Sequence, residues 1–377
     1  MKFLLTLAIG TSILAATTAR FAYEKGYCEI SIFNVLQDMF NREVSALINP
    51  RFRYSDNKGI RYDLYTPENI YDSQELRTGD RNALRTSNFN AKWPVRFSIH
   101  GWAGKSTTCS NAAIKDAYLA DGGKFNIIIV DWSDYSLDIS YARISKQLAS
   151  IAASFVKFIR FIQRETGISY ENIYLIGHSA GSHISGLTGK MLKPAMLGAI
   201  YALDPAGLTQ LGLSAQFRLA PSDAQYVESI HTDVTLLGNP SDKLSHAAFF
   251  PNWGQGQPHC PNLTAAEFDF ACDHFAALYY FVETIKDPKL FGAVQCADAH
   301  SIEQFECSCP DGRGACATTV FMGGEPAVHK RGVFYMSTQV QAPFGYGEMV
   351  RMKRAVDSTS TVVRQKNFKI RGFLSRW

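Results

Sequence analysis

Apolar runs alternate with amphipathic segments along the middle of the chain and predict strands and helices in turn. Strands are expected at residues 60–66, 93–100, 126–132, 173–176, 197–203 and 226–231. Residues 140–166 carry apolar side chains at three- and four-residue steps and predict one long helix; further helices are expected at 182–191 and 273–286. The run at 126–132 is apolar throughout, as in a strand covered on both faces. This alternation predicts an α/β fold with a mostly parallel central sheet.

A sharp turn is predicted at residues 177–181, where Gly-His-Ser-Ala-Gly separates a strand from a helix. Glycines on either side of a serine allow a very tight turn that exposes the hydroxyl group above the sheet. The helix that follows points its first N–H groups at a reacting oxygen. A Gly/Ser loop matched by chance is the alternative, which the flanking strand and helix disfavour. The sequence therefore predicts Ser179 as a nucleophile and the N–H of Ala180 as an oxyanion donor.

A serine nucleophile needs a base, and the base needs a carboxylate that orients it. In α/β hydrolases the chain order is serine, acid, histidine. Asp204 ends the next predicted strand and is the expected acid; the alternative is an aspartate that caps a turn before Pro205. The histidines that follow it are His231, His246, His259, His274, His300 and His329. We expect His274 to be the base because it starts a helix just after Cys272, and we expect His231 and His246 to be structural.

The oxyanion of an acyl-transfer reaction needs two N–H donors. The second donor is expected from the turn His100-Gly101-Trp102, at the end of an earlier strand, with Trp102 as the donor.

The first residues predict export. A lysine, a short apolar run and then small residues form a secretory signal peptide over residues 1–19. No later stretch approaches the roughly 20 apolar residues of a membrane-spanning helix. The eight cysteines fit four disulfides in an exported chain; they are Cys28, Cys109, Cys260, Cys272, Cys296, Cys307, Cys309 and Cys316. A zinc site among the last three is disfavoured by their spacing, and the net charge of +4 does not indicate a nucleic-acid partner.

Successive blocks of sequence resemble the pancreatic-lipase family of secreted animal lipases and phospholipases A1. The similarity runs from about residue 60 to residue 347. It is carried by Ser87-Asn88-Phe89-Asn90, His100-Gly101-Trp102, Val130-Asp131-Trp132, Gly177-His178-Ser179-Ala180-Gly181, Leu203-Asp204-Pro205-Ala206, Pro221-Ser222-Asp223-Ala224, Ile230-His231-Thr232-Asp233, Phe250-Pro251-Asn252, Cys272-Asp273-His274 and Tyr280-Phe281.

The resemblance implies an α/β-hydrolase fold with Ser179, Asp204 and His274 as the triad and Trp102 and Ala180 at the oxyanion hole. It implies the disulfides Cys260–Cys272, Cys296–Cys307 and Cys309–Cys316, which leaves Cys28–Cys109. It also identifies the segment between Cys260 and Cys272 as the lid. Only eleven residues lie there, as in family members that act as phospholipases A1, whereas the loop after Asp204 is about as long as in triacylglycerol lipases.

Calcium ligands of the family fall on Ala215 and Ala220 here, with Asp223 retained. A hard cation wants several oxygen ligands, so no metal and no other cofactor is expected. One glycosylation sequon is present, at Asn262 within the lid segment.

The resemblance also predicts the domain organisation. Residues 20–347 form the lipase domain, and the thirty residues 348–377 are too few for the β-sandwich domain that docks colipase in larger members. No colipase is therefore expected. The basic and aromatic tail is either solvated, which is the simpler reading, or contacts an anionic lipid or glycosaminoglycan surface.

We therefore expect a secreted hydrolase of lipid carboxyl esters that contacts membranes peripherally. Phospholipid cleaved at the sn-1 position is the first expected substrate and triacylglycerol the second. A non-catalytic lipid carrier of the yolk-protein type is the further alternative.

Overall fold

The computed structural model describes residues 59–138, 140–207, 214–260, 271–307 and 320–348. Their centre is a sheet of eleven strands in the order β10-β9-β11-β8-β7-β6-β5-β3-β4-β1-β2. Seven neighbouring strands are parallel: β4 (Asn126–Asp131), β3 (Val95–Ile99), β5 (Ile173–His178), β6 (Ala199–Leu203), β7 (Tyr226–Ile230), β8 (Ala247–Pro251) and β11 (Gly332–Met336). Antiparallel strands extend both edges: β1 (Arg61–Tyr65) and β2 (Gln74–Leu76), and β9 (Gly292–Cys296) and β10 (Val320–Phe321).

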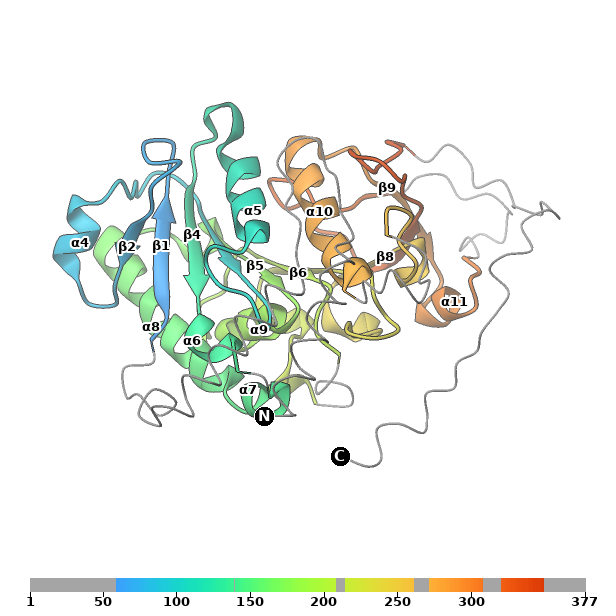
Figure 1. Ribbon diagram of the computed structural model, residues 1–377, viewed down its shortest axis with the longest axis horizontal. Helices are drawn as coiled ribbons and strands as arrows, with labels where there is room; N and C mark the ends of the chain where they lie inside the picture. The colour runs from blue at the N-terminus through green and yellow to red at the C-terminus, as the bar shows by residue number, and fades with distance from the viewer. Residues whose placement is uncertain (1–58, 139, 208–213, 261–270, 308–319, 349–377) are drawn as a thin grey trace, which may run out of the picture.

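Helices cover both faces of the sheet, so the architecture is the α/β-hydrolase type that the sequence predicts. Helix α8 packs against α9, and α10 packs against α5; Figure 1 shows α5 and α10 side by side in front of the strands. The α-helices are α4 (Arg81–Thr86), α5 (Cys109–Leu119), α6 (Ser133–Ser136), α7 (Tyr141–Ser145), α8 (Leu148–Thr166), α9 (Ala180–Leu192), α10 (Cys272–Lys286) and α11 (Ala299–Glu303). Short 3-10 turns are η1 (Ala120–Gly122), η2 (Tyr170–Asn172), η3 (Ala215–Phe217), η4 (Pro221–Asp223), η5 (Asp242–Leu244) and η6 (Asn252–Gly254).

Two hydrophobic cores explain why a central strand such as β6 is apolar on both faces. Successive side chains of a strand point to opposite faces. In β6, Ile200 belongs to the core beneath α8 and α9, whereas Tyr201 belongs to the core that contains Phe281 of α10. All five residues of this strand are buried. A strand in this position has no polar face, which is the pattern predicted for a parallel sheet.

The predicted long helix at 140–166 is wrong in one respect, because it is two helices. Helix α7 ends at Ser145 and α8 begins at Leu148. At the junction the Gln147 N–H donates to the carbonyl of Ile144 at 2.8 Å. That bond spans three residues instead of four, so the chain tightens and changes direction. The apolar spacing continues across the break, which is why the pattern alone predicted one helix.

The hydrophobic pattern did not predict β8, β9, β10, β11 or α5. The register of the central strands determines where the functional residues lie. Leu203 pairs with His178 on one side and with Ile230 on the other. The residues that follow β5, β6 and β7 therefore leave the sheet at the same edge, where ligands bind in open α/β sheets.

Candidate active site

Ser179 lies on a strained turn between β5 and α9. Its backbone has φ 55° and ψ −121°, and its N–H donates to the carbonyl of Leu203 at 2.9 Å. A Cβ atom at Gly177 would lie 2.5 Å from the carbonyl oxygen of Gly181. One at Gly181 would lie 2.3 Å from the carbonyl oxygen of Ile99 in β3. Only glycine fits either position, so the G-x-S-x-G spacing is a steric requirement of this turn.

Asp204 and His274 form a direct hydrogen bond although 70 residues separate them. His274 Nδ1 donates to Asp204 Oδ2 at 2.5 Å. The other carboxylate oxygen, Oδ1, accepts the N–H groups of Thr232 at 2.8 Å and Asp233 at 3.0 Å. Burial raises the pKa of Asp204, and the hydrogen bond and charge of His274 oppose that shift. The carboxylate is thereby fixed in one orientation and directs one nitrogen of the imidazole ring.

The backbone of His274 lies against the serine turn. His178, the residue before Ser179, donates from Nε2 to the carbonyl of His274 at 3.1 Å, and their rings are 4.6 Å apart. Burial, followed by the charge of His274, holds the pKa of His178 well below its usual value, so His178 acts as a neutral donor. This contact brings the start of α10 to the end of β5.

A β-turn at residues 101–104 lies beside the serine. The Gly104 N–H donates to the Gly101 carbonyl at 3.2 Å, and Ala103 has a φ of 62°. A Cβ atom at Gly101 would lie 2.8 Å from the Cβ of Ser179, so the backbone before Trp102 contacts the nucleophile turn. Ala180 is the first residue of α9, and its N–H has no acceptor within the helix. The structure therefore brings the turn that contains Trp102 against the residue that precedes Ala180.

The other candidate histidines have different surroundings. His231 is buried, with Nδ1 donating to the Asn239 carbonyl at 2.7 Å, and burial lowers its pKa to about 4. The ring of His246 accepts the Val227 N–H at 3.0 Å. His259 packs against Phe344, His329 stacks on Tyr226, and His300 is exposed on α11 beside Glu303. Among the histidines that the structure describes, His274 is the one recorded with a hydrogen bond to Asp204.

A second carboxylate, Asp233, lies close to the pair and was not predicted from the sequence. One of its oxygens lies within 4.8 Å of ligand atoms of Asp204 and His274, a grouping compatible with a metal ion. The carboxylate already accepts the N–H groups of Thr235, Leu236 and Leu237 at 2.9–3.3 Å, which closes its own turn. Its sequence signal was the block Ile230-His231-Thr232-Asp233, but only the fold places it beside His274.

Asp223, the retained carboxylate of the expected calcium region, is fully buried and paired with Lys190 of α9. It also accepts the N–H of Ala220 at 2.8 Å. The ammonium group of Lys190 thus supplies a positive charge to this carboxylate, while Ala215 and Ala220 offer no side-chain oxygen. The donor set at this position does not fit a hard cation.

Two disulfides are present in the described residues, Cys260–Cys272 and Cys296–Cys307. Both are pairs that the family resemblance implies, and the first fixes the residue at which α10 begins. Cys109 lies in α5, whereas Cys28, Cys309 and Cys316 lie outside the described residues. Asn262 and the segment 261–270, the signal peptide and the basic tail also lie outside them. In the part of the chain that is described, no helix combines the length and the apolarity that spanning a bilayer requires.

Comparison with known protein families agrees with this geometry. Residues 37–344 match the family described as Lipase. The chain belongs to the lipase family.

Relatives of this lipase-family chain include the pancreatic triacylglycerol lipase of Ictidomys tridecemlineatus, 33% identical over 277 residues, with 67% of this chain and 57% of the relative covered. Pancreatic lipase-related protein 2 of Rattus norvegicus is 32% identical over 276 residues, covering 67% of this chain and 57% of that protein. Inactive pancreatic lipase-related protein 1 of Mus musculus is also 32% identical, over 272 residues. The chain thus spans little more than half the length of these relatives.

Proposed function

We propose that this lipase-family chain hydrolyses carboxyl esters of lipids through an acyl-enzyme. The observation that carries the proposal is the hydrogen bond between His274 and Asp204 beside the strained turn of Ser179. A serine, a histidine and a carboxylate in this relation form the constellation of serine hydrolases. The family and the names of its relatives indicate lipids as the substrate class.

In the proposed reaction, the Oγ of Ser179 attacks the acyl carbonyl while His274 takes its proton. The N–H groups of Trp102 and Ala180 stabilise the oxyanion of the tetrahedral intermediate. His274 then gives its proton to the leaving alcohol as the ester bond breaks. A water molecule then attacks the acyl-enzyme while His274 takes its proton. His274 returns that proton to the Oγ of Ser179 as the fatty acid leaves, and Asp204 orients the imidazole ring throughout.

Phospholipid cleaved at the sn-1 position is the first proposed substrate. The support is the short stretch of eleven residues between Cys260 and Cys272, which the disulfide closes into a small loop. In the family that the sequence resembles, this segment is the lid, and a short lid covers little apolar surface and leaves room for a large polar head group. Triacylglycerol is the second candidate, favoured by the long loop after Asp204 and by the similarity to the pancreatic triacylglycerol lipase of Ictidomys tridecemlineatus.

A non-catalytic lipid carrier is a further candidate, because relatives of similar identity are described as inactive. Against it, the chain keeps all three of Ser179, His274 and Asp204, and His274 is hydrogen-bonded to Asp204.

Hydrolysis by the wild type and by Ser179→Ala separates these candidates. Both proteins would be given phosphatidylcholine vesicles and a triolein emulsion, with a chelator present. We expect the wild type to release sn-1 fatty acid from phospholipid and the variant to lose at least about 10³-fold of that rate. Release of fatty acid mainly from triolein would identify triacylglycerol as the substrate. Equal rates for the wild type and Ser179→Ala on both lipids would refute the proposal that Ser179 is the nucleophile.

A further inference from the structure

A chain of polar contacts leads from the turn at residues 101–104 to the edge of the sheet. His100 is buried at the end of β3, and its Nδ1 donates to the carbonyl of Gly101 at 3.0 Å. Its ring stacks on Trp132, with centroids 5.2 Å apart, and the indole Nε1 of Trp132 donates to the His100 carbonyl at 2.8 Å. A Cβ atom at Gly104 would lie 2.7 Å from His100 Nδ1, so the turn wraps closely around the ring. The position of the turn therefore depends on the orientation of His100.

Asp131 lies next along this chain. Its Oδ1 is 3.5 Å from His100 Nε2 and accepts the Ser133 N–H at 2.9 Å. Its Oδ2 accepts a hydrogen bond from Nη2 of Arg61 at 2.5 Å. Asp131 is buried, whereas about half of the Arg61 side chain is exposed. The arginine is thus the outer end of a chain that reaches the turn through two buried groups.

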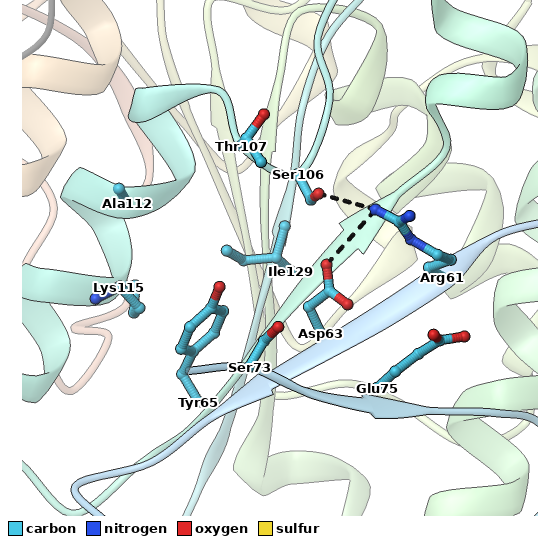
Figure 2. A pocket seen from close by; sticks show the side chains of 10 residues that line it. All are labelled: Arg61, Asp63, Tyr65, Ser73, Glu75, Ser106, Thr107, Ala112, Lys115 and Ile129. Atoms are coloured by element: carbon cyan, nitrogen blue, oxygen red, sulfur yellow. Dashed lines mark hydrogen bonds and ion pairs between the residues drawn. The ribbon is translucent and has the colours of Figure 1, made fainter. Parts of the chain in front are cut away.

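Arg61 also contacts the segment that follows the turn. Figure 2 shows its guanidinium group reaching from β1 across a polar pocket toward Ser106 and Asp63. The same Nη2 atom lies 3.1 Å from Ser106 Oγ and 4.0 Å from Asp63 Oδ2. Ser106 comes two residues after Gly104. One guanidinium group therefore fixes both Asp131, which faces His100, and the segment after the turn.

The contacts of His100 fix the orientation of its ring. A carbonyl can only accept, so Nδ1 is the donor to Gly101. At the other nitrogen, Nε2, the backbone N–H of Trp132 lies at 3.3 Å and Asp131 Oδ1 at 3.5 Å. Arg61 and Ser133 hold that carboxylate by hydrogen bonds, so the place of Asp131 against the ring depends on them.

We propose that Arg61 is a positioning residue for catalysis. Acting through Asp131 and His100, and directly on Ser106, it holds the turn at residues 101–104, and with it the N–H of Trp102, where the oxyanion forms. This inference rests on the proposed function, because an oxyanion develops only if the chain hydrolyses esters.

Loss of the guanidinium group would release both ends of this arrangement. Asp131 would lose the hydrogen bond on Oδ2, and Ser106 would lose its contact with the same atom. Asp131 would then be held less firmly against His100, whose ring supports the turn through the Gly101 carbonyl. The turn would therefore become less well fixed beside Ser179.

The test compares Arg61→Met, Arg61→Lys and the control Arg77→Met on a short soluble ester at neutral pH. Arg77 is exposed beside the same strands and pairs with Glu75. We expect kcat of Arg61→Met to fall about tenfold with KM nearly unchanged, because oxyanion stabilisation acts on the transition state. Arg61→Lys recovers most of the rate, and Arg77→Met equals the wild type.

An unchanged kcat in a folded Arg61→Met protein, or a loss that lysine does not recover, would overturn the proposal while leaving the esterase function intact. A wild type without activity on any ester would instead refute the proposed function. In that case NMR of the backbone amides still tests the role of Arg61. We expect the Trp102 amide signal to move in Arg61→Met and to stay in place in Arg77→Met. An unmoved Trp102 signal in Arg61→Met would refute the role of Arg61.

Discussion

Asp204 makes more contacts than orientation of His274 alone would need. Two backbone N–H groups from the loop after β7 hold Oδ1, which leaves Oδ2 to direct the histidine. The residue itself has a φ of 40°, a left-handed conformation that is uncommon for a residue with a side chain. Strain at both Ser179 and Asp204 is typical of functional positions, where surrounding contacts determine an unfavourable backbone.

Replacement of Asp204 by asparagine tests the role of its charge. The amide keeps the shape of the carboxylate, but it does not stabilise the imidazolium ion and permits the wrong tautomer of His274. We expect kcat to fall by about 10⁴-fold. The measurement is ester hydrolysis at neutral pH, with the exposed Asp72→Asn as the matched control. A loss smaller than about tenfold would mean that another carboxylate, with Asp233 the nearest described, orients the histidine.

Helix α9 links the nucleophile turn to the region after Asp204. Its first residue follows Ser179, and one of its last, Lys190, pairs with Asp223 of η4. Burial raises the pKa of Asp223, while Lys190 and the N–H of Ala220 oppose that rise. A buried carboxylate that loses its partner is costly, because the charge then lies in a poorly polarisable environment.

Replacement of Lys190 by methionine would leave that charge unpaired. We expect the free energy of unfolding at neutral pH to fall by about 3 kcal/mol. The loss should shrink as the pH falls, because the raised pKa lets Asp223 take up a proton in the folded state and the neutral acid carries no such cost. Urea denaturation at several pH values measures this, with the exposed Lys124→Met as the control.

The same experiment tests the prediction that no calcium ion is needed. Calcium should leave the unfolding midpoint of the wild type unchanged, since Lys190 already neutralises Asp223. A clear rise in that midpoint with calcium, or a deficit in the variant that calcium repairs, would contradict this account.

At the scale of the whole molecule, a buried ion pair connects the first half of the sheet to the last described part of the chain. Arg96 of β3 donates to both carboxylate oxygens of Glu325, at 2.8 Å and 2.7 Å, across 229 residues. The guanidinium group also lies 3.6 Å from the ring centroid of Tyr174. These residues lie near the starts of β3 and β5, away from the edge that carries Ser179.

Replacement of Glu325 by glutamine should therefore affect stability and not chemistry. We expect a loss of about 3 kcal/mol, because a buried guanidinium group is left without its counter-charge. Thermal unfolding and kcat would be measured together, with the exposed Glu303→Gln as the control. A large fall in kcat without a change in stability would show that the two ends of the sheet are coupled.

Local sequence determined the parts of this protein that short-range sterics control. The turn needs glycine at Gly177 and Gly181 because a Cβ atom at either position would lie within 2.5 Å of a backbone oxygen. The five-residue motif records that requirement. Strands such as β4 and β6 were recognisable because burial on both faces leaves few polar positions. The paired disulfide Cys260–Cys272 and the partnership of Ser179, Asp204 and His274 followed from a known order of blocks along the chain.

Tertiary structure decided what depends on residues far apart in sequence. The partners Arg61 and Asp131, Lys190 and Asp223, and Arg96 and Glu325 lie 33 to 229 residues apart. Each charged residue alone looks like an ordinary surface group, because no local pattern records which opposite charge the fold brings to it. The break between α7 and α8 is similar, since the apolar spacing runs through it. The sequence thus determined which strands end in the candidate catalytic residues. Packing across the sheet decided which other side chains hold those residues in position.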